Sequence, residues 1–346
     1  MTRTLQPDVA AVLEHIAGLE LPPLETLSAQ DARAFNVAAG AQRPPGPDVG
    51  EINDGALPGA DGSREYRLYR PATPGPHPVT VYFHGGGFVI GSHMSDDPFC
   101  RQLCIESDSI IVSVDYRHAP EHRFPAAHED GYAAAQWISK NLESLGGASG
   151  PIVLAGWSAG GNIAAVLAQQ ARDTGDFEIA GQVLIAPMTS PGERRPSHSE
   201  NAEGYSLTTS LLEWFIDNYV DRPDRDDPRV APLRASNLSD LAPALIVTAN
   251  FDPLRDEGTA YAGALAAAGT PVEHLACDGH THTSIVAVGI VESAASVRTH
   301  IADTIRAFHQ SRTNAGDVTG QRHPALSNDI IASRATSSSG KGRPRR

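Results

Sequence analysis

The sequence lacks the features that mark a disulfide-bonded secreted protein or a membrane protein. It has three cysteines, Cys100, Cys104 and Cys277, and so small and odd a set does not form a disulfide framework. We expect them to be buried free thiols. No stretch approaches about 18 uninterrupted apolar residues, which argues against a membrane-spanning helix. Residues 1–20 contain no secretory apolar segment, so we expect a cytoplasmic protein.

Positive charge is also scarce. The chain has 27 Lys and Arg against 41 Asp and Glu, which gives a net charge of −14. A nucleic-acid-binding protein needs a basic face, so we expect no nucleic-acid partner. Residues 311–346 depart from this balance, because they hold seven basic and two acidic residues and few hydrophobic ones. This composition predicts a disordered basic tail, with a weak tether to an anionic surface as the alternative.

What the sequence does have is the length and composition of a globular protein, with 346 residues of which 40% are hydrophobic. From residue 64 onward, strand patterns alternate with helical patterns. The predicted strands are 66–69, 79–83, 109–114, 151–155, 181–185, 244–248 and 272–276. The predicted helices are 128–143, 161–171, 255–268 and 291–309. This alternation predicts an α/β fold, with a mostly parallel sheet covered by helices on both faces.

Two regions outside this alternation are predicted to form a helical cap. Residues 1–55 show apolar residues at helical spacing after Asp8, a candidate N-cap, and Ser28 is placed to cap a second helix. Residues 187–243 are rich in Pro, Ser, Asp and Arg and contain one helical run, 211–219. Substrate clefts form at the carboxyl edge of a parallel sheet, where such an insertion lies. We expect residues 56–310 to form the main domain.

The strongest motif is GWSAG, residues 156–160, which follows the apolar run 152–155 and opens a helix-forming stretch. A strand, a Gly-x-Ser-x-Gly turn and a helix together form a nucleophile elbow, in which the sharp turn exposes the serine. The helix N-terminus beside Ser158 favours negative charge. The alternative is a tight turn with an incidental serine, but the surrounding pattern favours a nucleophile.

A second glycine-rich segment, HGGGF at residues 84–88, follows the predicted strand 79–83. Consecutive glycines cost conformational entropy, so a bare backbone must serve a purpose there. In acyl transfer, backbone N–H groups stabilise the oxyanion, and this segment supplies them. The predicted donors are the N–H groups of Gly86, Gly87 and Ala159. We expect Gly85 to help the turn and His84 to hold the loop. A phosphate-binding loop is disfavoured because the GK[ST] ending is missing.

A serine nucleophile needs a histidine to take its proton and a carboxylate to orient that histidine, in the chain order Ser, Asp, His. Asp252 follows the predicted strand 244–248 and is the predicted carboxylate, whereas Asp256 is expected at a helix start. Two loop histidines, His280 and His282, follow the last predicted strand, and spacing alone does not choose between them. A His-x-His metal site is disfavoured because no third ligand is evident.

The remaining histidines carry less information. His274 lies inside a predicted strand, where we expect it to be packed. His118, His122 and His128 form another cluster in the sequence. Pro120 lies between His118 and His122, so these two cannot share a helix face, and we expect loop or surface positions for the cluster.

Taken together, these motifs resemble the hormone-sensitive-lipase-like family of α/β-hydrolase carboxylesterases. The matching segments are HGGGF (84–88), DYR (115–117), APE (119–121), FPAA (124–127), GWSAGG (156–161) and DPLRDEG (252–258). The resemblance covers about residues 60–310. It implies an α/β-hydrolase fold with a helical cap that hydrolyses short- to medium-chain acyl esters, with no metal or organic cofactor. It also implies His282 as the base, because the family has Gly-x-x-His here and Gly279 precedes His282 at that spacing.

Two positions depart from the family's usual pattern. Trp157 stands where the family usually has Asp before the nucleophile, and Thr283-Ser284 stand where Gly-Phe usually follows the histidine. Both changes alter the walls near the serine, so the family's substrate preference does not transfer directly. The candidate pocket-lining residues are Phe88, Trp157, Trp214, Phe215 and Tyr219. For the last three, plain helix packing is the alternative.

Other functions remain open at this stage. The same triad could act on an amide, formamide, lactone or carbamate instead of a small-molecule ester. A binding protein without turnover is the alternative of another class, as in the gibberellin receptors, which resemble this family but lack the catalytic histidine. The presence of Ser158, Asp252 and His282 favours an enzyme. A homodimer is an open alternative to a monomer.

Overall fold

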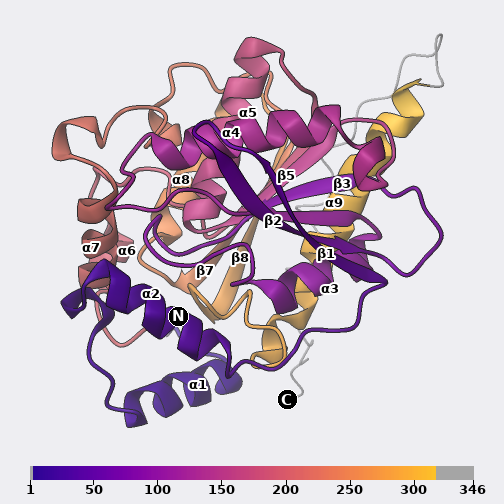
Figure 1. The fold of residues 1–346 in the computed structure, drawn as a ribbon. Helices are drawn as coiled ribbons and strands as arrows, with labels where there is room; N and C mark the ends of the chain where they lie inside the picture. Colours follow the sequence, from indigo (N-terminus) through magenta and orange to yellow (C-terminus); the bar gives the residue numbers. More distant parts are fainter. Residues whose placement is uncertain (1–2, 317–346) are drawn as a thin grey trace, which may run out of the picture.

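The computed structural model describes residues 3–316, with side chains up to residue 311; the rest of the predicted basic tail lies outside the described residues. An eight-stranded sheet in the order β1-β2-β4-β3-β5-β6-β7-β8 forms its centre (Figure 1). The strands are β1 (Glu51–Pro58), β2 (Ser63–Arg70), β3 (Val79–Phe83), β4 (Ile110–Val114), β5 (Ile152–Trp157), β6 (Ile179–Ile185), β7 (Ala244–Phe251) and β8 (Val272–Thr281).

The sheet is parallel from β4 to β8, and β1 and β2 add an antiparallel edge. Parallel strands covered on both faces are apolar throughout, and β3, β4 and β6 are buried at every residue. In the β3–β5 ladder, Phe83 pairs with Gly156. The ends of these two strands therefore bring HGGGF and Ser158 side by side.

Helices cover both faces of the sheet. One face packs against α3 (Asp97–Ser107) and α9 (Ala295–Gly316), and the other against α4 (Ala126–Lys140), α5 (Ala159–Thr174) and α8 (Arg255–Ala267). Side chains of a strand alternate between the two faces. In β5, Leu154 accordingly joins one hydrophobic cluster, and Val153 and Ala155 join the other. The short 3₁₀ helices η2 (Glu143–Leu145) and η5 (Glu292–Ala294) precede β5 and α9.

The N-terminal helices and the segment 187–243 lie together at one side of the molecule (Figure 1). These elements are α1 (Pro7–Gly18), η1 (Leu24–Thr26), α2 (Ala29–Gly40), α6 (Pro196–Glu200), α7 (Thr209–Tyr219), η3 (Arg222–Asp224) and η4 (Pro232–Arg234). The Ser210 hydroxyl donates to Glu25 at 2.7 Å and joins α7 to η1. Arg33 of α2 donates to the carbonyl oxygens of Val89 and Ala119, both at 2.7 Å, and so fixes α2 beside the HGGGF loop.

One strand and one long helix, β1 and α3, were not predicted from the sequence. β1 reads EINDGALP, and only Leu57 is buried, so no apolar alternation marks it. Its eight residues pair with β2, and this pairing makes the strand. The boundary predicted at residue 55 is wrong, because it falls inside β1. The second element, α3, buries Phe99, Leu103 and the thiols of Cys100 and Cys104 on one face.

Several element ends also differ from the prediction. α1 begins at Pro7 with Gln6 as its N-cap, so Asp8 is not the cap; its carboxylate accepts from the N–H and hydroxyl of Ser293 instead. The Ser28 cap of α2 is confirmed, since its hydroxyl accepts from the Asp31 N–H. The final helix runs to Gly316, beyond the predicted domain end at residue 310.

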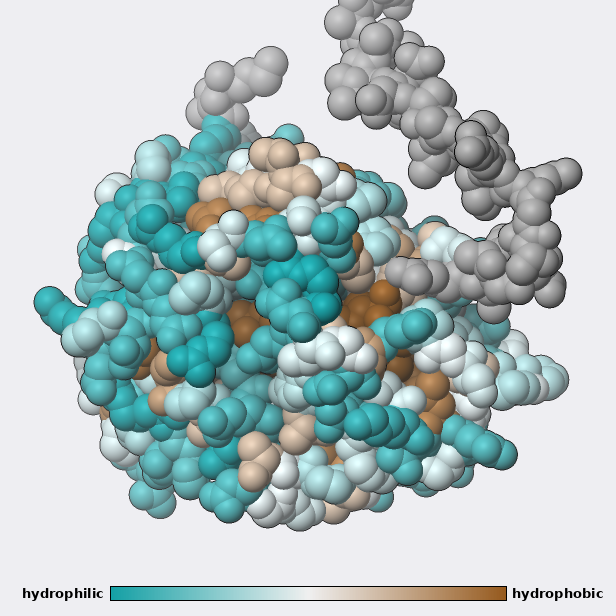
Figure 2. Space-filling view, turned by 90° about the horizontal axis from the view of Figure 1, so that it is seen from above, coloured by the Kyte–Doolittle hydropathy of each residue, from teal (hydrophilic) through white to brown (hydrophobic). Residues whose placement is uncertain are grey.

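The three cysteines are buried free thiols, as predicted. Within residues 3–316, no helix is long and apolar enough to cross a membrane. Seen from above, over α4 and α5, the surface is mostly hydrophilic, and hydrophobic residues form small separate patches (Figure 2). The cytoplasmic location and the homodimer stay predictions.

Candidate active site

Ser158 lies on the sharp turn between β5 and α5. Its backbone has φ 58° and ψ −115°, a strained conformation for a residue with a side chain. Two glycines allow the turn. A Cβ on Gly160 would lie 1.9 Å from the Phe83 carbonyl oxygen, and one on Gly156 would lie 2.2 Å from the Gly160 carbonyl oxygen. The end of β3, the end of β5 and the start of α5 can approach one another this closely only because both positions are glycine.

The structure brings Ser158 together with His282 and Asp252. The Ser158 Oγ lies 2.9 Å from His282 Nε2, and His282 Nδ1 lies 2.7 Å from Asp252 Oδ2. When Nδ1–H donates to the buried carboxylate, Nε2 is free to accept the serine proton. The other Asp252 oxygen accepts from the Leu254 N–H at 2.9 Å, which holds the carboxylate in place. This arrangement has the connectivity of a serine hydrolase triad.

The two alternative candidates for the histidine and carboxylate roles, His280 and Asp256, do not hydrogen-bond to Ser158 or His282. His280 Nδ1 lies 3.1 Å from the Ser284 hydroxyl, and burial lowers the pKa of His280. Asp256 lies in the first turn of α8, as predicted, and accepts from the Ser197 N–H. The residues alone left His280 and His282 open, whereas the geometry places His282 beside the serine.

The glycines of HGGGF fit closely against their surroundings. Gly86 and Gly87 have φ of 120° and 59°, which side chains rarely adopt. A Cβ on Gly85 would lie 2.3 Å from the Trp157 ring, and one on Gly87 would lie 2.2 Å from the Phe215 ring. The loop therefore runs against both the nucleophile elbow and α7, with its backbone exposed to the pocket.

Hydrogen bonds and ring stacking hold His84 at the start of this loop. Its Nδ1 lies 2.7 Å from the Gly85 carbonyl oxygen, and its ring stacks on Tyr116 with a centroid distance of 4.3 Å. The Tyr116 hydroxyl donates to the His84 carbonyl oxygen at 2.9 Å. These contacts fix the backbone that leads into Gly85.

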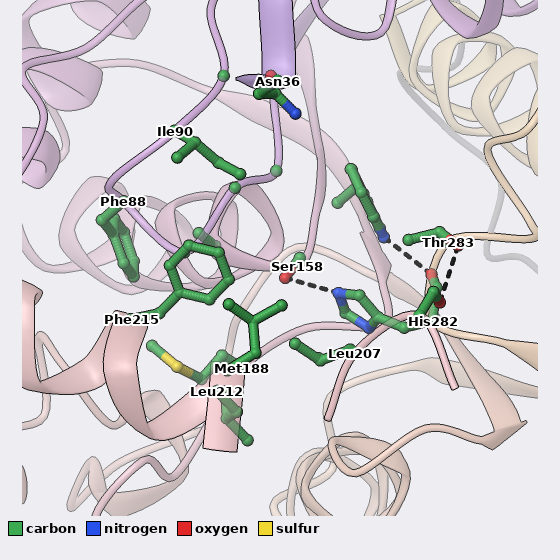
Figure 3. Close-up of a pocket in the computed structure, with 18 of the residues that line it drawn as sticks. Asn36, Phe88, Ile90, Ser158, Met188, Leu207, Leu212, Phe215, His282 and Thr283 are labelled. Atoms are coloured by element: carbon green, nitrogen blue, oxygen red, sulfur yellow. Dashed lines mark hydrogen bonds between the residues drawn. The ribbon is translucent and has the colours of Figure 1, made fainter. Parts of the chain in front are cut away.

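A cavity of about 200 Å³ opens onto Ser158. Figure 3 shows Phe88, Ile90 and Phe215 on its walls near the serine. The segments 1–55 and 187–243 contribute Leu24, Asn36, Arg43, Met188, Ser206, Leu207, Leu211, Leu212, Phe215, Ile216 and Tyr219. Most of these side chains are apolar, and Asn36 adds a polar group from α2. The cavity thus has an apolar wall and a few polar groups, which suits a small organic ligand.

One candidate pocket residue is misplaced. Trp214 does not line the cavity; it is half-buried and packs edge-on against Phe215, with ring centroids 5.3 Å apart. Successive helical residues differ by about 100° in direction, so the residue before Phe215 turns away from the pocket. Phe88, Trp157, Phe215 and Tyr219 do line the cavity.

The sequence analysis also missed a buried network behind the pocket. His128 is buried, which corrects the predicted loop or surface position. Its Nε2 lies 2.7 Å from the Asn162 side-chain oxygen, and its Nδ1 lies 3.2 Å from the Tyr219 hydroxyl. The Asn162 amide donates to the carbonyl oxygens of Met188 and Val230. The network joins α4, α5 and α7 to Met188 and Val230 of the inserted segment.

A buried carboxylate at the start of α8 anchors the same segment. Glu257 is fully buried and accepts from the N–H groups of Thr189 and Ser190, both at 2.7 Å. The sequence indicates only an acidic residue at a helix start within DPLRDEG and does not predict this role. Its contacts show that it holds the chain where the inserted segment leaves β6.

The fold and this constellation define an α/β hydrolase, and comparisons with known proteins agree. A family model described as the alpha/beta hydrolase fold matches residues 80–286. Esterase LipI of Mycobacterium tuberculosis is 44% identical over 70% of this chain and 78% of its own. The ethyl acetate hydrolase of Pseudomonas putida is 38% identical over 84% of this chain and 95% of its own.

Solved structures give the same result. An ester hydrolase from the metagenome of Lake Arreo, bound to a bipyridine phosphonate derivative, superposes with a TM-score of 0.85 at 35% identity. That match covers 89% of this chain and 100% of the other. The chain belongs to the hormone-sensitive-lipase-like esterase family, and it is a carboxylesterase.

Proposed function

We propose that this carboxylesterase hydrolyses short- to medium-chain acyl esters through a triad of Ser158, His282 and Asp252. The observation that carries the proposal is the continuous pair of hydrogen-bond distances, 2.9 Å from Ser158 Oγ to His282 and 2.7 Å from His282 to Asp252. His282 takes the serine proton as Oγ attacks the ester carbonyl, and Asp252 stabilises the imidazolium that forms.

The oxyanion is stabilised by backbone N–H groups of Gly86, Gly87 and Ala159. Ala159 is the first residue of α5, where N–H groups have no partner within the helix. His282 then protonates the leaving alcohol, which departs and leaves an acyl-serine. Water attacks the acyl-serine with His282 as base, which releases the acid and restores Ser158. No cofactor is needed for these steps.

Residues 1–55 and the segment 187–243 act as a cap that shapes the acyl site. The proposal is supported by their share of the pocket wall, which includes Leu24, Met188, Leu212 and Phe215. The cavity of about 200 Å³ is small, since sites for drug-sized ligands measure about 300–1,000 Å³. A small, mostly apolar cavity favours acyl chains of a few carbons.

The test is the hydrolysis of p-nitrophenyl esters from acetate to dodecanoate by the wild type and Ser158→Ala. Serine-dependent turnover that peaks at short or medium chains is the expected result. Turnover that survives in Ser158→Ala would refute the assigned nucleophile. If no ester is cleaved, a fluorophosphonate mass-shift assay distinguishes two cases. Labelling at Ser158 would indicate an amide, lactone or carbamate substrate, and no labelling would indicate a binding protein.

A further inference from the structure

Three histidines surround one carboxylate, Asp115, near the HGGGF loop. His84 directly follows β3, His93 lies further along the same connection to α3, and His118 lies in the loop after β4. The Asp115 Oδ1 lies 3.4 Å from His84 Nε2 and 4.0 Å from His118 Nε2. The Asp115 Oδ2 lies 3.6 Å from His93 Nδ1. The connection after β3 thus meets the loop after β4 at Asp115.

None of these three ring nitrogens has a hydrogen-bond partner within the described part of the chain, although all three are buried. His84 and His93 expose 0% and 6% of their surfaces. A buried polar atom without a partner costs about 1–3 kcal/mol, so three of them facing one carboxylate need an explanation.

The second ring nitrogen of His84, Nδ1, indicates which protonation state the ring has. Its Nδ1 lies 2.7 Å from the Gly85 carbonyl oxygen, a distance at which Nδ1 must carry the proton and donate. In a neutral imidazole, Nε2 then presents a lone pair toward the Asp115 carboxylate. Two lone pairs at 3.4 Å repel each other unless a proton or a metal ion lies between them. A metal-binding histidine commonly donates its second N–H to a backbone carbonyl in this way.

We propose that His84 Nε2, His118 Nε2 and an Asp115 oxygen bind one divalent transition-metal ion, with zinc as the preferred ion. The three ligand atoms lie within 4.8 Å of one another. In a tetrahedral zinc site with bonds of about 2.0–2.1 Å, neighbouring ligand atoms lie about 3.3 Å apart, so only small side-chain shifts are required. Imidazole and carboxylate ligands suit zinc, and water fills the fourth position.

The remaining members of the cluster act on Asp115. His93 Nδ1 faces the second carboxylate oxygen, and Glu65 offers another carboxylate within 4.8 Å of both. His93 is therefore a positioning residue that orients the carboxylate ligand. The ion takes no part in ester cleavage. The ion links the segments that follow β3 and β4, directly before Gly85. Its effect is to raise the free energy of unfolding of this region.

The test uses the full chain without a polyhistidine tag, stripped with a chelator and titrated with zinc by calorimetry. We expect one zinc per chain and a rise in melting temperature. His118→Ala should weaken binding at least 100-fold, and His93→Ala about 10-fold. His122→Ala, an exposed histidine four residues from His118, should bind zinc as the wild type does. Substitution with cobalt should give the visible absorption bands of a tetrahedral site in the wild type.

The alternative is a set of imidazolium–carboxylate ion pairs with no metal. Failure of the stripped wild type to bind one zinc would overturn the proposal. So would equal zinc affinity in the wild type and His118→Ala, because the ion would then bind elsewhere. The cobalt spectrum needs no variant, so the test stands even if His118→Ala folds poorly.

Discussion

The indole N–H of Trp157 donates to the carbonyl oxygen of His282 at 3.2 Å, and the two rings lie 5.4 Å apart. The residue before the nucleophile therefore holds the loop that carries the base. The same indole lies where any Cβ on Gly85 would meet it. One side chain thus contacts the elbow, the histidine loop and the HGGGF loop.

The first prediction concerns this hydrogen bond. Trp157→Phe keeps an aromatic ring against Gly85 but removes the N–H donor. The net value of such a bond is about 0.5–1.5 kcal/mol, so we expect kcat to fall about 3- to 10-fold as His282 loses its constraint. The Michaelis constant should change little, because the acyl pocket keeps its apolar wall. Steady-state kinetics on p-nitrophenyl butyrate would measure both quantities.

Trp214→Phe is the matched control for this experiment. It makes the same chemical change on a half-buried tryptophan that packs beside Phe215 and does not contact His282. Its kcat should remain within twofold of the wild type. An unchanged kcat in Trp157→Phe would show that the indole only fills space.

The second prediction distinguishes His280, near the end of β8, from His282, just after it. His282→Ala should lower kcat by about 10⁴-fold or more, because the serine loses the base that takes its proton. His280→Ala should keep most of the activity, since its ring bonds to Ser284 and not to Ser158. Turnover by both variants on the same ester, together with their melting temperatures, checks the assignment. If His280→Ala is the inactive variant while folded, the triad proposed here is wrong.

The third prediction concerns acyl length. Leu212 is buried in α7 and lines the cavity. Leu212→Ala should enlarge the apolar end, so kcat/KM should rise for longer p-nitrophenyl esters relative to acetate. A matched control is Leu145→Ala, since Leu145 is also buried but lies in η2, away from the pocket. Both variants should lose stability, by about 2–5 kcal/mol for a well-packed leucine. Only the first should change the ratio of rates, and equal ratios in both would place the acyl group elsewhere.

Some of the site could be predicted from the sequence because its parts are local. The elbow needs a strand, a serine between glycines and a helix, and all three occur within residues 152–174. Asp252 could also be predicted locally, because it directly follows the strand β7. The choice of His282 over His280 came from the family's loop spacing, since both residues are local candidates. Only the structure shows that the His282 ring, and not the His280 ring, reaches Ser158.

Other features depend on contacts between distant segments and leave no local pattern. β1 is made by its pairing with β2. The Trp157–His282 contact joins residues 125 positions apart. The cluster around Asp115 collects His84 and His93 from the connection after β3 and His118 from the loop after β4. Residue type singled out some of these positions, but only the folded chain shows that they meet.

The fourth prediction concerns acid stability. Burial lowers the pKa of His128 and of His309 to about 4 in the folded chain, whereas an unfolded histidine titrates near about 6.5. The unfolded state therefore binds more protons below pH 6.5, so the stability present above that pH is lost as the pH falls toward 4. Each histidine contributes a slope of about 1.4 kcal/mol per pH unit in this window.

His309 offers the cleaner test, because burial alone lowers its pKa and its Nε2 lies 3.1 Å from the uncharged Thr80 hydroxyl. His309→Gln should reduce the dependence of unfolding free energy on pH by about 1.4 kcal/mol per unit between about pH 6 and 4.5. Urea unfolding at four pH values would measure this slope for the variant and the wild type. His122→Gln, at an exposed position, should leave the slope unchanged. Carboxylates titrate in all three proteins, so the difference in slope between wild type and His309→Gln isolates the contribution of His309. Identical slopes in these two proteins would show that the pKa of His309 is not lowered by folding.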